Sequence, residues 1–288
     1  MMGPRALLRE GAQRLRLAGM DHAQQDAEWL LSRLLGSNPL ELYLEEHDIP
    51  EPTIERFFSQ LKARAAGTPI QYLLREAEFF GERFIVRPGV FIPRPETEAI
   101  VEAALEALRA GAEEVGRPLR LLDLGTGSGC IAVTLARRLP ACVVVGVEVS
   151  WTALRIAREN ILRHGLTSRV QLVQGRWLDP IGGVVDGIVS NPPYIPSAQV
   201  DQLPLDVRRE PRLSLDGGSD GMRELNSLVI QMPRVLRAGG VAALECGEEH
   251  VSELVRHTSA ASWVEHVRPL QDLAGRPRGV LITRRRHG

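Results

Sequence analysis

The stretch LLDLGTGSGC, residues 121–130, decides the fold, because it joins an apolar run to the start of an apolar helix pattern. Its three glycines, Gly125, Gly127 and Gly129, allow a tight turn and a close approach of the backbone to a ligand. The spacing follows the G-x-G-x-x-G fingerprint of nucleotide-binding folds, with the small residue Cys130 in its last position. The stretch predicts a strand, a glycine-rich loop and a helix.

Outward from this loop, strand patterns alternate with helix patterns. Apolar runs predict seven strands, over 119–125, 143–149, 170–174, 185–190, 241–246, 262–269 and 279–285. Apolar residues at helical spacing predict helices over 130–138, 152–165, 222–240 and 248–258. The order predicts an α/β fold with a doubly wound, mostly parallel, seven-stranded Rossmann-like sheet. Only a loop joins the last two strands, so we expect them to be antiparallel neighbours.

The beginning of the chain has a different pattern. Helical spacing predicts helices over 6–19, 26–36 and 51–67, and a short one over 39–46. Aromatic and β-branched residues with glycine and proline turn signals follow, which predicts a β hairpin. Another helix is predicted over 95–110. We therefore expect a small all-helical domain over 1–67, a β-hairpin linker over 68–93 and an α/β domain over 94–288.

Composition and charge exclude several classes of function. The net charge of −1 gives no chain-wide attraction to nucleic acid or to an anionic membrane. There is no signal-peptide pattern, and no stretch approaches the roughly 18 continuous apolar residues of a membrane span. The cysteines, Cys130, Cys142 and Cys246, lack CxxC spacing, which predicts buried reduced thiols. We expect a cytoplasmic protein without membrane association, and no metal, because the histidines lack ligand spacing.

Two acidic residues make the glycine-rich loop more specific. Glu148 ends the second predicted strand, where its two oxygens can accept both hydroxyls of a ribose. Asp123 precedes the glycines, where a carboxylate would repel a pyrophosphate but attract the ammonium and sulfonium groups of S-adenosyl-L-methionine. The pattern favours that methyl donor, with S-adenosyl-L-homocysteine as product. The alternative for Asp123 is a cap on backbone N–H groups of the loop.

Trp177 follows the third predicted strand in the sequence VQGRWL. Strand ends of a doubly wound sheet meet at the ligand site, so its ring could pack on adenine. An ordinary core position is the alternative.

The fourth predicted strand ends in a second motif, in DGIVSNPPYIPS, residues 186–197. Pro192 and Pro193 fix φ at about −65° and remove two N–H donors. The side-chain oxygen of Asn191 and the carbonyl of Pro192 remain as fixed acceptors, and Tyr194 adds a flat face. Two fixed acceptors suit a planar –NH2 group, because they hold both hydrogens and aim the nitrogen at a methyl donor. A rigid proline turn is the alternative interpretation.

At this point the chain resembles the family of peptide chain release factor N5-glutamine methyltransferases, the PrmC/HemK family. The resemblance covers nearly the whole chain. It rests on GTPIQYLLREAEFFGERFIVRPGVFIPRPETE, DLGTGSGCIAVTLA, IVSNPPYIP, REPRLSLDGGSDG and DLAGRPRGV. It implies a methyltransferase domain that uses S-adenosyl-L-methionine to methylate the glutamine of the Gly-Gly-Gln motif in release factors. The helical N-terminal domain would help to dock this protein partner.

The resemblance and the residue patterns together define an expected site. Catalytic roles fall to Asn191, Pro192 and Tyr194, and the substrate glutamine would contact Asn191, Pro192, Pro193 and Tyr194. The expected cofactor residues are Asp123, Gly125, Thr126, Gly127, Ser128, Gly129, Glu148, Trp177 and Asn191. Three residues depart from the family pattern. Arg75 replaces an expected glycine and Glu148 the commoner aspartate, while Arg176 replaces an aspartate that could accept from the adenine amino group.

Two further segments have open interpretations. Arg94, Glu96 and Thr97 in IPRPETE could flank the methionine end of the cofactor or simply begin a helix. The loop 209–221 could close over a substrate or be a surface turn. Other functions also stay open: a glutamine methyltransferase of a ribosomal protein, an N6-adenine methyltransferase of RNA or DNA, or a non-catalytic binding module. We expect a monomer without a direct nucleic acid partner.

Overall fold

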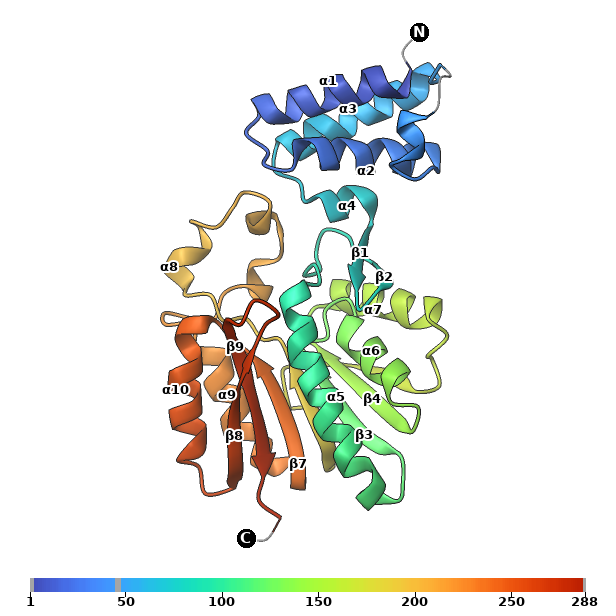
Figure 1. The fold of residues 1–288 in the computed structure, drawn as a ribbon. Coiled ribbons are helices and arrows are strands. Elements are labelled where there is room, and N and C mark those ends of the chain that lie inside the picture. Colours follow the sequence, from blue (N-terminus) through green and yellow to red (C-terminus); the bar gives the residue numbers. More distant parts are fainter. Residues whose placement is uncertain (1–2, 45–47, 287–288) are drawn as a thin grey trace. The chain divides into compact units, whose positions relative to one another are not determined.

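The structure, a computed structural model, describes residues 3–44 and 48–286. The chain forms two compact units (Figure 1). The first comprises Met1–Glu76 and Pro204–Arg209, and the second Ala77–Leu203 and Glu210–Gly288. The domain boundaries expected from the sequence, after residues 67 and 93, stay a prediction.

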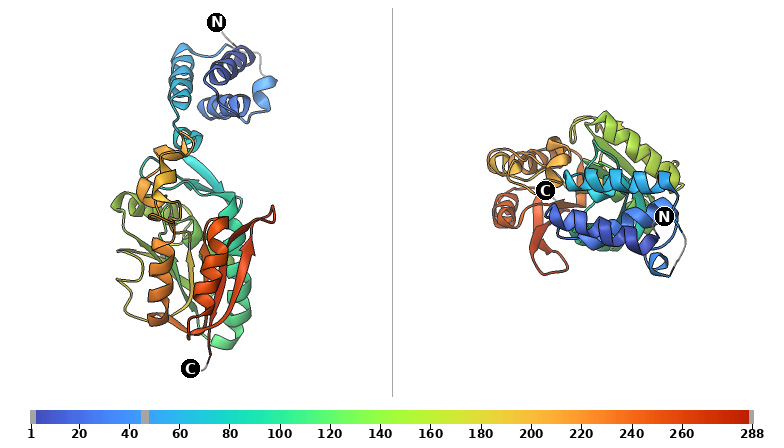
Figure 2. Two further views of the ribbon diagram at one scale, coloured as in Figure 1. Left: turned by 90° about the vertical axis from the view of Figure 1, so that its left-hand side faces the viewer. Right: turned by 90° about the horizontal axis from the view of Figure 1, so that it is seen from above.

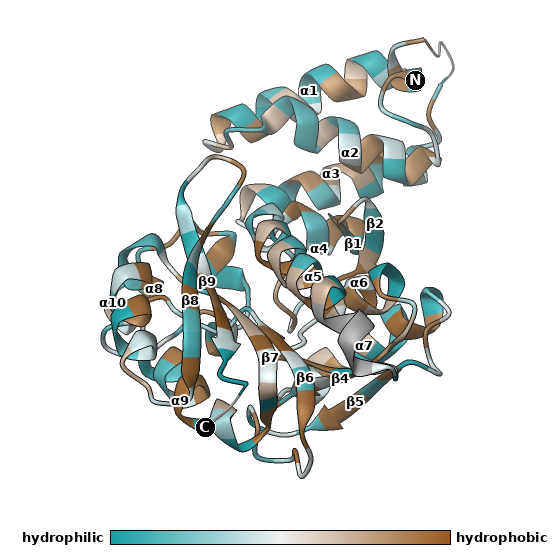
Figure 3. Cartoon of the chain, turned by 60° about the horizontal axis from the view of Figure 1, so that its bottom comes forward, coloured by the Kyte–Doolittle hydropathy of each residue, from teal (hydrophilic) through white to brown (hydrophobic). Residues whose placement is uncertain are grey.

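The first unit is helical, as the sequence predicts. Its elements are α1 (Pro4–Leu17), α2 (Ala23–Leu35), η1 (Glu41–Tyr43), α3 (Glu51–Ala65) and α4 (Ile70–Leu74). The helices carry teal and brown residues side by side in Figure 3, because each turns an apolar stripe toward the shared core. The short helix expected over 39–46 is a single turn at 41–43, and residues 45 and 46 lie outside the described ones.

Three close contacts, one at Gly11 and two at Arg64, fix the packing of this unit. Gly11 of α1 lies against α3, where an added Cβ would stand 2.7 Å from the ring of Phe57. The buried guanidinium of Arg64 donates to Asp26, with Nε and Oδ2 2.7 Å apart. Its Nη1 also lies 3.3 Å from Oδ2 of Asp206. The contact between Arg64 and Asp206 ties residues 204–209 to α3, which is far away in the sequence.

The expected β hairpin is shorter than the segment 68–93. Strands β1 (Glu76–Phe79) and β2 (Glu82–Ile85) form it, and Phe80 and Gly81 make its two-residue turn, both at positive φ. Assigning 70–74 to the hairpin segment was wrong, because these residues form α4. Arg75 ends that helix at φ 60°, the left-handed conformation that favours the glycine expected there.

The second unit contains the predicted seven-stranded sheet. Its order is β5-β4-β3-β6-β7-β9-β8, and only the pairs that involve β9 are antiparallel. The strands are β3 (Leu119–Leu124), β4 (Cys142–Glu148), β5 (Val170–Gln174), β6 (Val185–Ser190), β7 (Leu236–Glu245), β8 (Val264–Gln271) and β9 (Pro277–Arg284). The strand order reverses beside β3, which lies between β4 and β6. In doubly wound sheets a ligand site lies at such a point.

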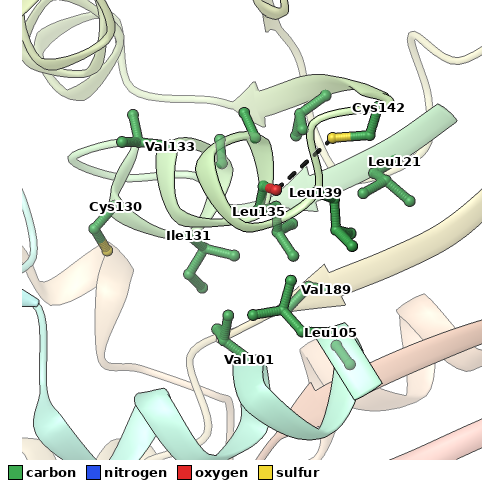
Figure 4. Close-up of a cluster of buried hydrophobic side chains, with 14 of the residues drawn as sticks. Val101, Leu105, Leu121, Cys130, Ile131, Val133, Leu135, Leu139, Cys142 and Val189 are labelled. Atoms are coloured by element: carbon green, nitrogen blue, oxygen red, sulfur yellow. Dashed lines mark hydrogen bonds between the residues drawn. The ribbon is translucent and has the colours of Figure 1, made fainter. Parts of the chain in front are cut away.

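Helices cover both faces of this sheet, and Figure 2 shows the layers from two sides. Helices α5 (Pro95–Val115), α6 (Cys130–Arg138) and α7 (Trp151–Arg163) share one apolar core, and α9 (Arg223–Gln231) and α10 (Glu248–Ser259) share the other. Consecutive residues of β3 point to opposite cores, Leu121 to the first and Leu122 to the second. Figure 4 shows the first core, where side chains of α5, α6, β3 and β6 meet.

One boundary differs clearly from the sequence prediction. A helix was expected over 222–240, but α9 ends at Gln231 and a 3₁₀ turn, η4 (Met232–Arg234), follows. Pro233 explains this end, because proline has no N–H for the helical ladder and its ring disturbs the preceding turn. Strand β7 therefore begins at Leu236 rather than at 241. Within the described residues, no helix combines the length and the apolar character needed to cross a membrane.

The remaining short elements belong to the chain after β6. They are α8 (Ser197–Val200), η2 (Val207–Arg209) and η3 (Arg212–Ser214). The last two fall in or beside the loop 209–221, and a bridge between Ile195 and Asp216 joins that loop to the motif after β6.

Candidate active site

A cavity of about 480 Å³ opens in the second unit where β3, β4 and β6 end. Its volume lies in the range of roughly 300–1,000 Å³ that is typical of small-molecule sites. All the expected cofactor residues line it except Asp123 and Gly129. Of the expected substrate residues, Asn191 and Pro193 line it, whereas Pro192 and Tyr194 do not.

Asp123 is fully buried beneath the glycine-rich loop. Its Oδ2 accepts from the hydroxyl of Thr126 at 2.5 Å and from the backbone N–H of Ala132 at 2.9 Å. Burial raises the pKa of Asp123 to about 7, although these hydrogen bonds act in the opposite direction. The carboxyl group thus caps the loop and the first turn of α6. A direct role toward a cofactor stays a prediction.

The three loop glycines have different tasks. Gly125, Gly127 and Gly129 all have positive φ, which side chains other than glycine adopt at a free-energy cost. Gly129 lies under α7, and an added Cβ would stand 3.3 Å from Cβ of Ala157. Gly129 therefore allows helix packing, while Gly125 and Gly127 expose bare backbone to the cavity.

Glu148 ends β4 at the wall of the cavity. Its Oε2 accepts from the backbone N–H of Gly127 at 3.1 Å and its Oε1 from the N–H of Ser150 at 2.8 Å. These bonds hold the carboxylate in one orientation. Each oxygen can accept a further hydrogen bond, so the pair is able to bind two neighbouring hydroxyls.

At Trp177, the structure adds a residue that the sequence interpretation missed. Glu224 at the start of α9 is buried and accepts from Nε1 of Trp177 at 2.7 Å. Arg176 donates to both of its oxygens, at 3.0 and 2.9 Å, and Arg223 to one of them at 2.8 Å. A carboxyl group like the one that an aspartate at position 176 would supply is thus present nearby, on Glu224 of α9.

The cluster also fixes the charge of Glu224 and the place of the indole. Burial raises the pKa of Glu224, but hydrogen bonds from Arg223 and Trp177 and the charge of Arg176 outweigh it and lower the pKa. Trp177 has φ 49°, and its ring would stand 3.4 Å from a Cβ added to Gly125. The ring is therefore held against the glycine-rich loop.

Asn191 follows β6 directly, and its amide has a defined orientation. Its Nδ2 donates to the hydroxyl oxygen of Thr97 at 3.0 Å. Thr97 is buried in the first turn of α5 and also lines the cavity. The Ser190 hydroxyl donates to the carbonyl of Leu124 at 2.7 Å, which holds the end of β6 against β3.

Tyr194 lies on the other side of the two prolines. Its hydroxyl donates to Oε1 of Glu245 at 3.1 Å, and its ring is edge-on to His250 with the centroids 6.4 Å apart. Burial raises the pKa of the Tyr194 phenol. The flat face expected for substrate packing does not line the cavity, so that role stays a prediction.

The IPRPETE segment and the loop 209–221 meet at the cavity. Both oxygens of the buried Glu210 accept from that segment, one from the backbone N–H of Ile92 at 2.8 Å and the other from Arg94. Arg94, Thr97 and Pro211 line the cavity, whereas Glu96 does not. The loop is thus part of the site wall.

Other reactive groups have no comparable arrangement. The three cysteines are buried and free, as predicted, and burial raises the pKa of Cys130 and of Cys246 to about 12. In the described part of the chain, no group of three or more histidine, cysteine, aspartate or glutamate residues is placed to hold a metal ion.

Comparisons with known proteins agree with this geometry. Residues 6–74 match the family model of the PrmC N-terminal domain, and residues 83–204 match that of the methyltransferase small domain. The chain is 40% identical over 283 residues to the release factor glutamine methyltransferase of Moorella thermoacetica, covering 98% of both chains. It is also 40% identical over 268 residues to the release factor glutamine methyltransferase of Chlorobaculum tepidum, covering 91% of this chain and 90% of that one.

A solved structure shows the same fold at much lower identity. The hMettl16 catalytic domain in complex with the MAT2A 3′UTR hairpin 6 has a TM-score of 0.55 to this chain and is 16% identical, covering 84% of each chain. The fold, the cavity at the strand ends and the two relatives of 40% identity lead to one conclusion. The chain is a methyltransferase and belongs to the release factor glutamine methyltransferase family.

Proposed function

We propose that the chain transfers a methyl group from S-adenosyl-L-methionine to the side-chain amide nitrogen, N5, of the glutamine in the Gly-Gly-Gln motif of peptide chain release factors. The observation that carries the proposal is the orientation of Asn191. Its side-chain nitrogen donates a hydrogen bond to Thr97, so its side-chain oxygen remains as an acceptor at the cavity wall. The family relationship supports the choice of glutamine as substrate.

The residues present fit S-adenosyl-L-methionine. Gly125 and Gly127 leave a cradle without side chains beside the cavity. Glu148 retains acceptor capacity for both ribose hydroxyls, and the indole of Trp177 offers a flat wall for adenine. When bound, this cofactor would supply an electrophilic methyl group on a positively charged sulfur.

The chain's own groups then need only to orient the glutamine amide and to stabilise the charge that develops on its nitrogen. The Asn191 oxygen would accept one hydrogen of the glutamine amide, and the carbonyl of Pro192, which stands between the cavity-lining residues Asn191 and Pro193, would accept the other. Together they would aim the amide nitrogen at the methyl group. Both oxygens would stabilise the positive charge that develops on the glutamine nitrogen as it takes the methyl group from sulfur. The alkylated nitrogen then loses a proton to water. A strong general base is unnecessary, because alkylation makes that proton acidic.

The partner and the location follow from this substrate. A Gly-Gly-Gln loop suits a narrow cavity, because two glycines leave little bulk beside the glutamine. We assign the docking of the release factor to the helical first unit, and a cytoplasmic location follows from a substrate that works in translation. The enzyme would act as a monomer without binding nucleic acid directly.

Methyl transfer from labelled S-adenosyl-L-methionine tests the proposal. Purified release factor, the same factor with its motif glutamine replaced by alanine, ribosomal protein and nucleic acid are offered side by side. We expect label on the intact release factor alone. Label on ribosomal protein would change the assigned partner, and label on nucleic acid alone would refute the proposal.

A further inference from the structure

We propose that Arg176 is a specificity-determining residue that makes the base subsite of the cavity accept a 6-oxopurine, hypoxanthine, as readily as adenine. The inference rests on the proposed function, which places adenine against Trp177, and it names what the edge of that subsite recognises. The residues concerned are Arg176, Arg223 and Glu224, which line the cavity together with Trp177.

Glu224 is surrounded by hydrogen-bond donors. Its Oε1 accepts from Nη2 of Arg176 at 3.0 Å and from Nε of Arg223 at 2.8 Å. Its Oε2 accepts from the same Arg176 nitrogen at 2.9 Å and from Nε1 of Trp177 at 2.7 Å. Arginine and tryptophan side chains can only donate hydrogen bonds, so the direction of each of these contacts is fixed.

These contacts leave Glu224 no capacity to recognise a base. A carboxylate has about four acceptor sites, two on each oxygen, and each oxygen of Glu224 already receives two donors. The 6-amino group of adenine would therefore find no acceptor on this acid, although the acid lines the cavity. Glu224 instead holds the indole of Trp177 and the two arginine side chains in place.

The two guanidinium groups remain accessible to a ligand. The side chain of Arg176 is 59% exposed and that of Arg223 is 55% exposed. Within the described part of the chain, Arg176 donates only through Nη2, which leaves the N–H groups of Nε and Nη1 for a ligand. Two guanidinium groups against one carboxylate also leave a net positive charge. A base that lies against Trp177 thus meets donors, to which it must offer acceptors.

Adenine and hypoxanthine differ at such an edge by one group. Both bases have an acceptor at N7, but adenine carries an amino donor at position 6 where hypoxanthine carries an oxygen acceptor. A guanidinium group commonly binds O6 and N7 of a 6-oxopurine together, whereas a side-chain amide pairs with N6 and N7 of adenine. Arg176 can therefore donate to N7 of either base and also to O6 of hypoxanthine. Loss of the amino group would break no contact with this residue.

Binding of two product analogues to the free protein tests the inference without methyl transfer. S-adenosyl-L-homocysteine and S-inosyl-L-homocysteine differ only in adenine against hypoxanthine, and calorimetric titration of the full chain measures both dissociation constants. We expect the two constants to agree within about threefold. A site that reads the 6-amino group would bind the inosyl compound roughly 10- to 100-fold more weakly.

Substitutions of Arg176 should create the missing selectivity. Arg176→Gln introduces an amide that can pair with N6 and N7 of adenine, and it should weaken the inosyl compound roughly tenfold relative to the adenosyl compound. Arg176→Asp, which can only accept, should shift the ratio of the two constants in the same direction. Any general damage to the cavity affects both ligands and cancels in this ratio. Arg158→Asp, the same charge change at an exposed position of α7 outside the cavity wall, should leave the ratio unchanged.

The outcomes separate this inference from the proposed function. The inference is overturned if the wild-type chain binds the inosyl compound more than tenfold more weakly, or if neither Arg176 variant changes the ratio. Both results would leave methylation of release factor standing. Equal binding of the two compounds without methylation of release factor would contradict the proposed function and leave the inference standing. If neither compound bound, the S-adenosyl-L-methionine site would be wrong, and both would fail.

Discussion

At the scale of single residues, the cavity is organised by hydrogen bonds that select one orientation of each polar group. Glu148 is held by two backbone N–H groups, Asn191 by Thr97, and Trp177 by Glu224. Preorganised groups of this kind stabilise developing charge without having to rearrange. The clearest test is to remove the Asn191 side chain.

Asn191→Ala should lower kcat by about 10²- to 10³-fold, the effect expected when one preorganised group at the reacting centre is lost. Cofactor affinity should stay within about threefold of wild type, because the loop, Glu148 and Trp177 remain. Steady-state kinetics and calorimetric titration of S-adenosyl-L-methionine measure the two effects. Asn226→Ala, on α9 and away from the cavity wall, serves as control. Equal losses of kcat and affinity would show that Asn191 is mainly a cofactor residue.

Glu224 gives a second prediction at this scale. Its lowered pKa keeps it ionised at neutral pH, so Trp177, Arg176 and Arg223 all donate to a charged acceptor. Glu224→Gln removes that charge, and the affinity for S-adenosyl-L-methionine should fall roughly 3- to 10-fold with little change in kcat. Calorimetric titration measures the affinity. Glu253→Gln, on the exposed face of α10, should have no effect. An unchanged dissociation constant in Glu224→Gln would exclude this role.

At the scale of secondary structure elements, local signals account for most boundaries. Helix α6 spans Cys130–Arg138 as expected, because a glycine at positive φ precedes it and its apolar spacing is regular. The helix expected over 222–240 ends before Pro233. The prediction followed the apolar spacing through this residue and gave too little weight to the helix-breaking effect of proline. The segment LRAGG was assigned to that helix, but the parallel register with β6 makes its first residue, Leu236, the start of β7. The apolar pattern of a segment does not show with which strand, or in which register, that segment will pair.

Arg75 gives a prediction at the element scale. It ends α4 at φ 60°, where a residue with a Cβ costs roughly 1 kcal/mol relative to glycine. Arg75→Gly should therefore raise the free energy of unfolding by about 0.5–1 kcal/mol, as measured by urea denaturation. Arg33→Gly, on an exposed face within α2, should lower it by about 1 kcal/mol. Destabilisation by Arg75→Gly would mean that the arginine side chain itself stabilises the turn.

At the scale of the whole molecule, two buried acids make the second unit sensitive to pH. Burial raises the pKa of both Asp123 and Glu245 to about 7. In the unfolded chain they titrate near 4, so between about pH 4 and 7 the folded state binds more protons than the unfolded state. The free energy of unfolding should therefore fall as the pH rises through this window and then level off above pH 7.

Glu245→Gln is neutral at every pH and should remove its share of that fall. The stability difference between pH 5 and pH 8 should shrink by on the order of 1–3 kcal/mol relative to wild type. Urea denaturation at the two pH values measures it. Glu253→Gln, an exposed acid, should keep the wild-type difference. A variant as pH-dependent as wild type would show that Glu245 does not titrate in this range.

The sequence by itself determined the features that neighbouring residues encode. These are the glycine-rich loop, the alternation of strands and helices, the stiff Asn-Pro-Pro-Tyr ending and the family resemblance. Only the tertiary structure decided which groups face these motifs. Glu224 reaches Trp177 from α9, Thr97 reaches Asn191 from α5, and Glu245 reaches Tyr194 from β7. The physical reason is that parallel strands bring their carboxyl ends to one edge of the sheet, so contacts there depend on strand order and register. No local pattern records which partners that register brings together.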